Sequence, residues 1–215
     1  MRRWTRIAAL ASAVFALLVL GAAMRPLAFP ENRSAAPVLT AVEIGFVQDM
    51  TIHHQQALLM VQRLDRSVDP AITRLAEQLD RTQRLEIGTM LGWLRLVDAA
   101  PSSDRPMAWM HAAHASPHRH PAAAAQTAST PLMPGMASSA ELDALATARG
   151  RDAEILFLQL MFRHHQGGIT MAEAADGLLR SGPVKEIARA MIHGQGQEAG
   201  TMGMLLTQRG AAPRP

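Results

Sequence analysis

The chain has 215 residues, of which 48% are hydrophobic and 18% are charged. This length suits one ordinary domain or a duplicated smaller one, and the composition excludes wholesale disorder. The absence of cysteine excludes disulfides, thiolate zinc sites, iron–sulfur clusters and a cysteine nucleophile. Three of the 21 basic residues lie in the first six positions, and the other 18 equal the 18 acidic residues in number. A basic face is therefore not supported, and we expect no nucleic-acid partner.

The amino terminus has the pattern of an export signal. Its three arginines precede an uncharged run from Ile7 to Met24, which is just long enough to span a bilayer. We predict that residues 1–24 are a signal peptide or a membrane anchor, with attachment through residues 7–24 if the segment is retained. A buried core helix is the less favoured alternative, because the run has no polar face. Residues 25–39 are predicted to be a tether, and the rest of the chain to be exported to the periplasm or the extracellular space.

The remaining sequence contains an internal repeat. Residues 46–60, FVQDMTIHHQQALLM, align without a gap on residues 157–171, FLQLMFRHHQGGITM, with seven of 15 positions identical. Downstream, residues 75–90 align on residues 187–202 and share the pattern Gln-x-x-Glu-x-x-x-Met. The chain is therefore interpreted as a tandem duplication.

Each half is predicted to be a helical hairpin. Helix-start signals occur at four points: Thr40–Glu43, Asp69–Pro70, Ser138–Glu141 and Gly182–Pro183. They indicate helices of about 20 to 28 residues, and no segment alternates with the period of a strand. We predict an all-α fold, an antiparallel four-helix, ferritin-like bundle over residues 40–210, with hairpins at 40–98 and 139–210.

Residues 99–138 are predicted to be a long, loosely ordered crossover between the hairpins. The segment is rich in alanine, proline and serine, and it also contains four histidines and four methionines: His111, His114, His118, His120, Met107, Met110, Met133 and Met136. Weak metal capture and a chance accumulation of these residues are equally compatible with the pattern.

Each of the four predicted helices has a row of apolar residues that faces the core. In all four, polar residues interrupt this row at the same height along the predicted bundle. The first and third helices place a His pair between methionines, and the second and fourth place Gln and Glu before a methionine. Buried imidazoles and carboxylates are costly unless they are paired, and bundle cores hold metal ions with ligands from facing helices. The candidate ligands are Met50, His53, His54, Met60, Glu86, Met90, Met161, His164, His165, Met171, Glu198 and Met202.

Imidazole and thioether without thiolate favour a copper ion, with silver as a surrogate, and we rank iron and zinc below copper. The predicted function is copper sequestration or transfer rather than turnover, with the two glutamates as ligands or as acceptors that orient the histidines. One alternative is a structural or partner-binding bundle whose polar layer only sets helix register. Another is a ferritin-like metal-dependent oxidoreductase, although the sequence contains no Glu-x-x-His pattern. No protein partner or oligomeric state is predicted.

These motifs resemble the bacterial domain of unknown function family 305. The family pattern, Phe…Met-x-x-His-His-x-x-Ala/Gly…Met followed by Gln-x-x-Glu-x-x-x-Met, occurs twice, over about residues 41–97 and 131–209. The resemblance implies a ferritin-like bundle that is exported or membrane-anchored, and similar proteins include periplasmic copper-binding and copper-resistance factors. By motif match, the twelve candidate residues would inherit the ligand role. Gln56-Ala57 and Gly167-Gly168 stand where Gly-Ala is more usual, and Gln56 is expected to crowd the first site.

Overall fold

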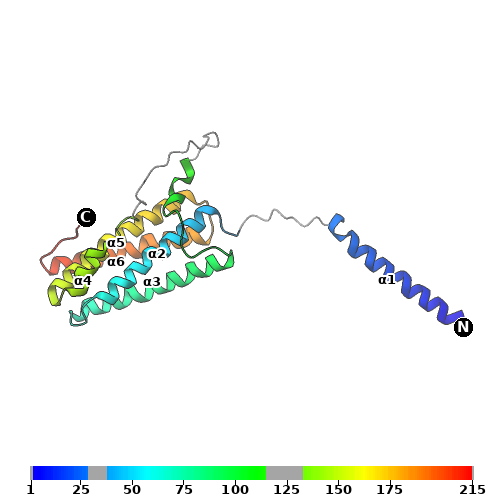
Figure 1. Cartoon of the computed structure of the whole chain (residues 1–215), viewed down its shortest axis with the longest axis horizontal. Helices are drawn as coiled ribbons and strands as arrows, with labels where there is room; N and C mark the ends of the chain where they lie inside the picture. The colour runs from blue at the N-terminus through cyan, green and yellow to red at the C-terminus, as the bar shows by residue number, and fades with distance from the viewer. Residues whose placement is uncertain (1, 29–37, 115–132, 215) are drawn as a thin grey trace. The chain divides into compact units, whose positions relative to one another are not determined.

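The computed structural model describes residues 2–28, 38–114 and 133–214, and all regular structure in these ranges is helical. Six α-helices and one 3₁₀ helix occur there, and these ranges contain no strand (Figure 1). The all-α prediction is therefore confirmed for the described part of the chain. By its contacts the chain divides into two units, Met1–Val38 and Leu39–Pro215.

The first unit contains helix α1, Arg2–Ala28. It extends beyond Met24, so the first residues of the predicted tether are helical, whereas residues 29–37 lie outside the described ranges. Counting only residues whose placement is described, no helix is both long enough and apolar enough to cross a membrane. Export and membrane attachment stay predictions.

The second unit consists mainly of two helical hairpins. Helix α2 (Ala41–Arg63) packs along α3 (Pro70–Leu96), and α5 (Gly150–Leu178) packs along α6 (Pro183–Gln208). Helices α2 and α5 contact each other and join the hairpins (Figure 1). Each half of the sequence repeat thus corresponds to one hairpin, with the His-containing helices at the centre.

Local sequence sets the start of several helices. Thr40 and Glu43 form a capping box at the start of α2, in which each side chain accepts a hydrogen bond from the other residue's backbone N–H. Asp69 accepts from the N–H of Ala71 at 2.7 Å, and Pro70 is the first residue of α3. Such side chains satisfy backbone donors that have no partner within the helix.

The second half differs from the single long helix predicted to start at Ser138. Helix α4 (Ser139–Thr147) ends after nine residues, and α5 begins at Gly150, whose φ is +52°. The backbone N–H of Gly150 donates to Asp65 in the α2–α3 loop at 2.9 Å. The side chain of Arg149 donates to the carbonyls of Ala146 and Ala148 at the end of α4. A tertiary contact and a glycine therefore break this helix in two.

The core of the second unit contains two apolar clusters. One includes Met50, Met90 and Met171, and the other includes Met60, Met161 and Met202. Met50 precedes the His pair of α2, whereas Met171 follows the His pair of α5, so the two helices run in opposite directions where they meet. The His pairs lie between the two clusters along the helices. The polar level predicted from the sequence therefore separates two methionine-containing apolar regions.

The described parts of the crossover are docked rather than loose. Asp49 of α2 is buried and accepts from the N–H of Met107 at 2.6 Å and from Trp109 Nε1 at 2.9 Å. Burial raises the pKa of this carboxyl group, and the two N–H donors oppose the shift. The ring of Trp109, in the 3₁₀ helix η1 (Ala108–His114), packs edge-on against Phe46. A buried carboxylate needs hydrogen-bond donors, and Asp49 obtains them from this part of the crossover. The segment is therefore docked, whereas its composition predicted a loosely ordered one.

The crossover histidines are only partly described. His111 is exposed. The side chain of His114 and the whole of His118 and His120 lie outside the described residues. Metal binding by this segment stays an open prediction.

Candidate metal centre

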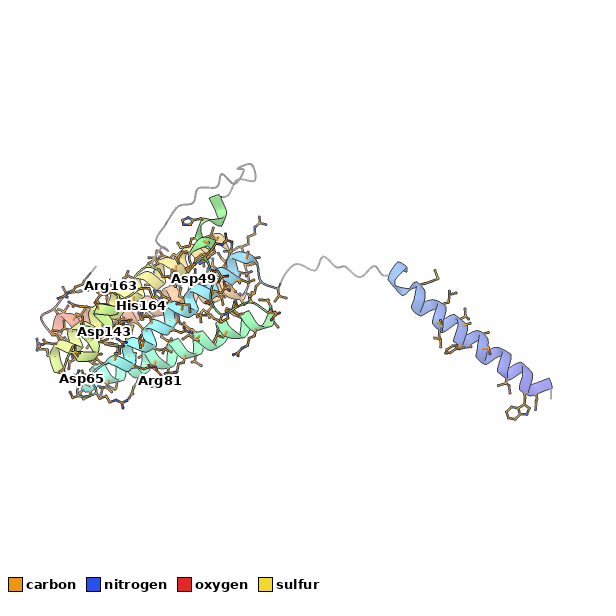
Figure 2. All side chains as sticks on the ribbon, in the orientation of Figure 1. Asp49, Asp65, Arg81, Asp143, Arg163 and His164 are labelled. Atoms are coloured by element: carbon orange, nitrogen blue, oxygen red, sulfur yellow. The ribbon has the colours of Figure 1, made fainter. Side chains whose placement is uncertain are left out.

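Four buried histidines form a layer where α2 meets α5. His53 and His54 come from α2, His164 and His165 come from α5, and each is at most 1% exposed. The rings of His53 and His164 are stacked, with centroids 3.8 Å apart and an interplanar angle of 29°. His164 lies midway along the helices (Figure 2). Equivalent residues of the two repeats therefore meet face to face inside the molecule.

A carboxylate from the outer helix of each hairpin holds one histidine of each pair. His54 Nε2 donates to Glu86 of α3 at 2.6 Å, and His165 Nε2 donates to Glu198 of α6 at 2.8 Å. The Glu86 side chain is 19% exposed and that of Glu198 is 10% exposed. When a carboxylate accepts from Nε2 of a neutral imidazole, the proton is fixed there and the lone pair is left on Nδ1.

Main-chain carbonyls hold the other two rings. His53 Nε2 donates to the carbonyl of Pro134 at 3.0 Å, and His164 Nε2 donates to the carbonyl of His53 at 2.8 Å. Burial, with the nearby His54, lowers the pKa of His53 to about 3, although the bond to Pro134 opposes the shift. Burial and the facing His53 lower the pKa of His164 well below its usual value. Both rings are therefore neutral near pH 7, which is the form that binds metal ions.

All four Nδ1 atoms in this layer are buried and have no hydrogen-bond partner. Gln83 Oε1 of α3 and Gln195 Nε2 of α6 are likewise buried without a partner. These six atoms are the complete set of such side-chain atoms in the described part of the chain. Buried polar atoms without partners are rare, and their concentration at one level points to a binding role.

The predicted candidates lie in the interior of the second unit, with their methionines divided between the two apolar clusters. Ten of the twelve are at most 1% exposed, namely Met50, His53, His54, Met60, Met90, Met161, His164, His165, Met171 and Met202. Glu198 is buried and Glu86 is half-buried. Within the described residues, however, no three His, Asp or Glu side chains are grouped so that they could hold one metal ion. A metal centre here would therefore depend on thioether donors as well.

A short segment at the end of the crossover is hydrogen-bonded to His53 through the carbonyl of Pro134. We call residues 133–137 the strap. The side-chain amide of Gln56 donates to the carbonyl of Ala137 at 2.9 Å and accepts from its N–H at 2.6 Å. Gln56 therefore binds the strap through both ends of its side-chain amide. The sequence could not indicate that the Pro134 carbonyl accepts from His53, because every residue has a main-chain acceptor.

The two glycines that depart from the family pattern serve close packing. A Cβ on Gly167 would lie 1.9 Å from the carbonyl oxygen of Pro134 in the strap. A Cβ on Gly168 would lie 2.3 Å from Oε1 of Gln195. Gly167 thus lets the strap approach α5, and Gly168 makes room for the glutamine of α6.

We expect Gly167→Ala to lower the free energy of unfolding by about 1–3 kcal/mol, because the new methyl group overlaps the strap backbone. Gly177→Ala, on the same helix, is the matched control, since nothing lies within 4 Å of its added Cβ. That control is expected to be stabilising by about 0.4–1 kcal/mol. Urea unfolding measures both changes, and a stabilised Gly167→Ala protein would contradict the close contact.

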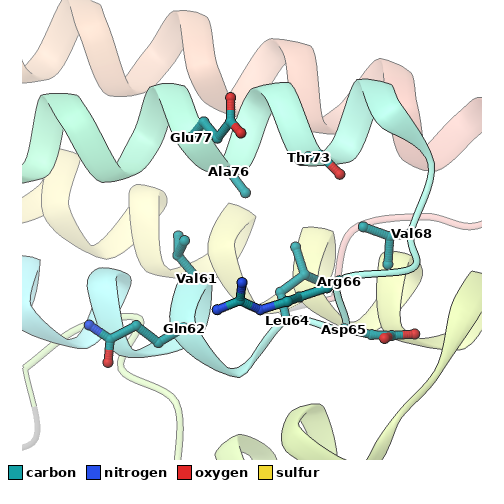
Figure 3. A pocket seen from close by; sticks show the side chains of 9 residues that line it. All are labelled: Val61, Gln62, Leu64, Asp65, Arg66, Val68, Thr73, Ala76 and Glu77. Atoms are coloured by element: carbon teal, nitrogen blue, oxygen red, sulfur yellow. The ribbon is translucent and has the colours of Figure 1, made fainter.

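Two surface cavities formed by the described residues lie away from the histidine side chains. One cavity of about 400 Å³ lies between the end of α2 and the first half of α3, and Figure 3 shows its nine lining residues, none of them a candidate ligand. A second cavity of about 410 Å³ borders the strap, where Pro134, Gly135 and Gly167 are among its lining residues. The histidines themselves line neither cavity.

Comparison with known proteins gives a family and a fold. The family described as domain of unknown function (DUF305) matches residues 43–206. A DUF305 protein from Streptomyces coelicolor, which carries the description of a secreted protein, is 36% identical, with a TM-score of 0.69 over 81% of this chain and 96% of that chain. A DUF305 fragment from Deinococcus radiodurans is 32% identical, with a TM-score of 0.61 over 79% of this chain and 97% of that chain.

A more distant solved structure is CopM in its Cu(I)-bound form. It is 23% identical, with a TM-score of 0.55 over 77% of this chain and 96% of that chain, a likeness that shows the fold alone. CopM has also been solved in Cu(II)-bound and Ag-bound forms. No curated protein matches the chain.

Proposed function

The chain belongs to the DUF305 family, and on that premise we propose that it binds copper in the histidine layer and acts by sequestration or transfer. The observation that carries this proposal is the set of four buried Nδ1 atoms that have no partner. Each ring is already held by a hydrogen bond from its Nε2 atom. A metal ion could therefore bind Nδ1 without displacing the hydrogen bond at Nε2. The carboxylate–histidine pairs have the arrangement that commonly orients metal-binding histidines.

The proposed donors are the imidazole Nδ1 atoms together with the buried methionines on either side of the layer. Imidazole nitrogen combined with soft thioether sulfur suits Cu(I) and, as a surrogate, Ag(I) better than ions that prefer oxygen ligands. Glu86 and Glu198 are proposed to orient His54 and His165 rather than to bind the ion, because their carboxylates already accept from Nε2. CopM, solved with Cu(I), Cu(II) and Ag, is consistent with this choice of metal.

The setting of the site is also part of the proposal. We interpret the two packed hairpins as the antiparallel, ferritin-like four-helix bundle expected from the repeat. We place the protein outside the cytoplasm, with residues 1–24 as its signal or anchor. The description of the Streptomyces protein as secreted supports this placement.

The proposal is tested by anaerobic titration of the full chain with Cu(I) in competition with a chromophoric chelator. We expect the double variant His54→Ala/His165→Ala to lose at least about 100-fold in affinity, because it removes two oriented nitrogen donors. His193→Ala is the matched control, since this histidine of α6 is exposed, and it should bind as the wild type does. Unchanged stoichiometry and affinity in the double variant would refute the site.

A purely structural layer is the second candidate. It is favoured by the finding that no three His, Asp or Glu side chains in the described residues are grouped for one ion. A ligand that binds only the folded state raises the unfolding temperature in a concentration-dependent way. Thermal unfolding with and without Cu(I) separates the two functions: a structural layer predicts no shift.

A further inference from the structure

The burial of the four imidazoles poses an access problem. Each is at most 1% exposed, so an ion cannot reach the Nδ1 atoms without a local opening. Separating α2 from α5 would expose the apolar clusters on both sides of the layer, which is costly. A smaller movement that uncovers one histidine is therefore the more accessible opening.

The strap is the segment that lies against the Nε2 edge of His53. Three hydrogen bonds join it to α2: one from His53 Nε2 to Pro134 and two between Gln56 and Ala137. On its other side the strap borders the surface cavity of about 410 Å³. These three bonds are part-buried, and only a short segment of chain lies between the cavity and His53. Local openings that break a few such bonds cost less free energy than separation of the helices.

The two repeats are unequal at this point. His53 donates to the strap, whereas His164 donates to the carbonyl of His53, which is part of helix α2. The residue that matches Gln56 in the second repeat is Gly167, which has no side chain to hold such a segment. One ring of the stacked pair is thus held by a separable strap, and the other is held by a helix.

We infer that the strap, residues 133–137, is the gate to the histidine layer, with Gln56 as its latch and His53 as the first histidine reached. As a route for copper this inference rests on the proposed function. Gln56 is a positioning residue, since it acts on His53 through the strap. Loss of its two hydrogen bonds should raise the frequency of opening on the order of ten- to thirty-fold.

The experiment compares Gln56→Ala with Gln55→Ala, an exposed neighbour on α2 that serves as the control. In the metal-free full chain, hydrogen exchange at the Ala137 amide reports loss of its hydrogen bond to Gln56. Labelling by diethyl pyrocarbonate, located at His53 by mass spectrometry, reports access to the ring. We expect both rates to rise on the order of ten- to thirty-fold in Gln56→Ala and to stay at wild-type values in Gln55→Ala.

A further variant and a metal measurement complete the test. Gln56→Glu keeps an acceptor for the Ala137 N–H but loses the donor. Its rates of exchange at Ala137 and of labelling at His53 should therefore lie between those of the wild type and of Gln56→Ala. In the copper-loaded protein, removal of Cu(I) by a chelator should be faster in Gln56→Ala, with unchanged stoichiometry.

Each failure has a separate meaning. Faster exchange at Ala137 with unchanged labelling of His53 would overturn the gate, and unchanged exchange at Ala137 would overturn the latch. Faster labelling with an unchanged rate of Cu(I) removal would overturn the copper route. If the wild type binds no Cu(I), the proposed function fails, while the metal-free measurements still decide the gate.

Discussion

Acidification from about pH 7.5 to about pH 5 is expected to lower the free energy of unfolding by about 4 kcal/mol, through two buried histidines. An unfolded histidine takes up a proton near its usual pKa of about 6.5. The pKa of folded His53 is lowered to about 3, and that of His164 is also well below its usual value. The stabilisation is therefore complete above the unfolded pKa and is lost as the pH falls toward the folded pKa, at about 1.4 kcal/mol per pH unit for each ring.

Urea unfolding at a series of pH values measures this slope. The variant His53→Leu removes one of the two rings and should halve the slope between about pH 6 and about pH 5, whatever its effect on stability at neutral pH. His193→Gln, at an exposed position, should leave the slope unchanged. A stability that is flat with pH in the wild type would show that the buried rings accept protons.

Glu154→Ala is expected to lower the free energy of unfolding by about 3 kcal/mol, because it breaks a buried ion pair. The carboxylate accepts from the backbone N–H of Asp69 at 2.7 Å and from Arg209 Nε at 2.5 Å. The side chains of Glu154 and Arg209 are only 11% and 10% exposed. The change leaves Arg209 without its ion-pair partner and removes one of the hydrogen bonds that join the α2–α3 loop to α5.

The exposed pair between Arg63 and Asp143 provides the control. Their side chains are 31% and 75% exposed, so Asp143→Ala should change the free energy of unfolding by no more than about 0.5 kcal/mol. Chemical denaturation at neutral pH measures both variants. Equal losses in the two proteins would show that burial does not set the strength of the Glu154 pair.

Much of the fold could be predicted from periodicity and helix-start signals. The capping boxes at Thr40 and Ser138 occur as expected, because a side chain three residues away can satisfy free backbone donors without any tertiary contact. The break between α4 and α5 could not be predicted, since it depends on Asp65, 85 residues away, binding the N–H of Gly150.

The candidate site divides in the same way. The repeat identified the four histidines and the methionines, because inward positions follow from helical spacing. The stacking of His53 on His164 and the docking of Gln56 on the strap depend on how the two halves meet. The role of Asp49 in docking the crossover was not predicted. Its counterpart in the second repeat is Leu160, and this mismatch between the halves is the signal that could have identified it.

The amino-acid sequence by itself determined the duplication, the helical hairpins, the family and the residue types at the polar level, because these depend on short motifs and on their recurrence along the chain. Only the tertiary structure decided which nitrogen of each histidine is held and which is free, and which ring the strap covers. Those features arise from acceptors on other helices and on the main chain, at Glu86, Glu198, Pro134 and His53. Their distance from the rings is set by packing and not by any local pattern.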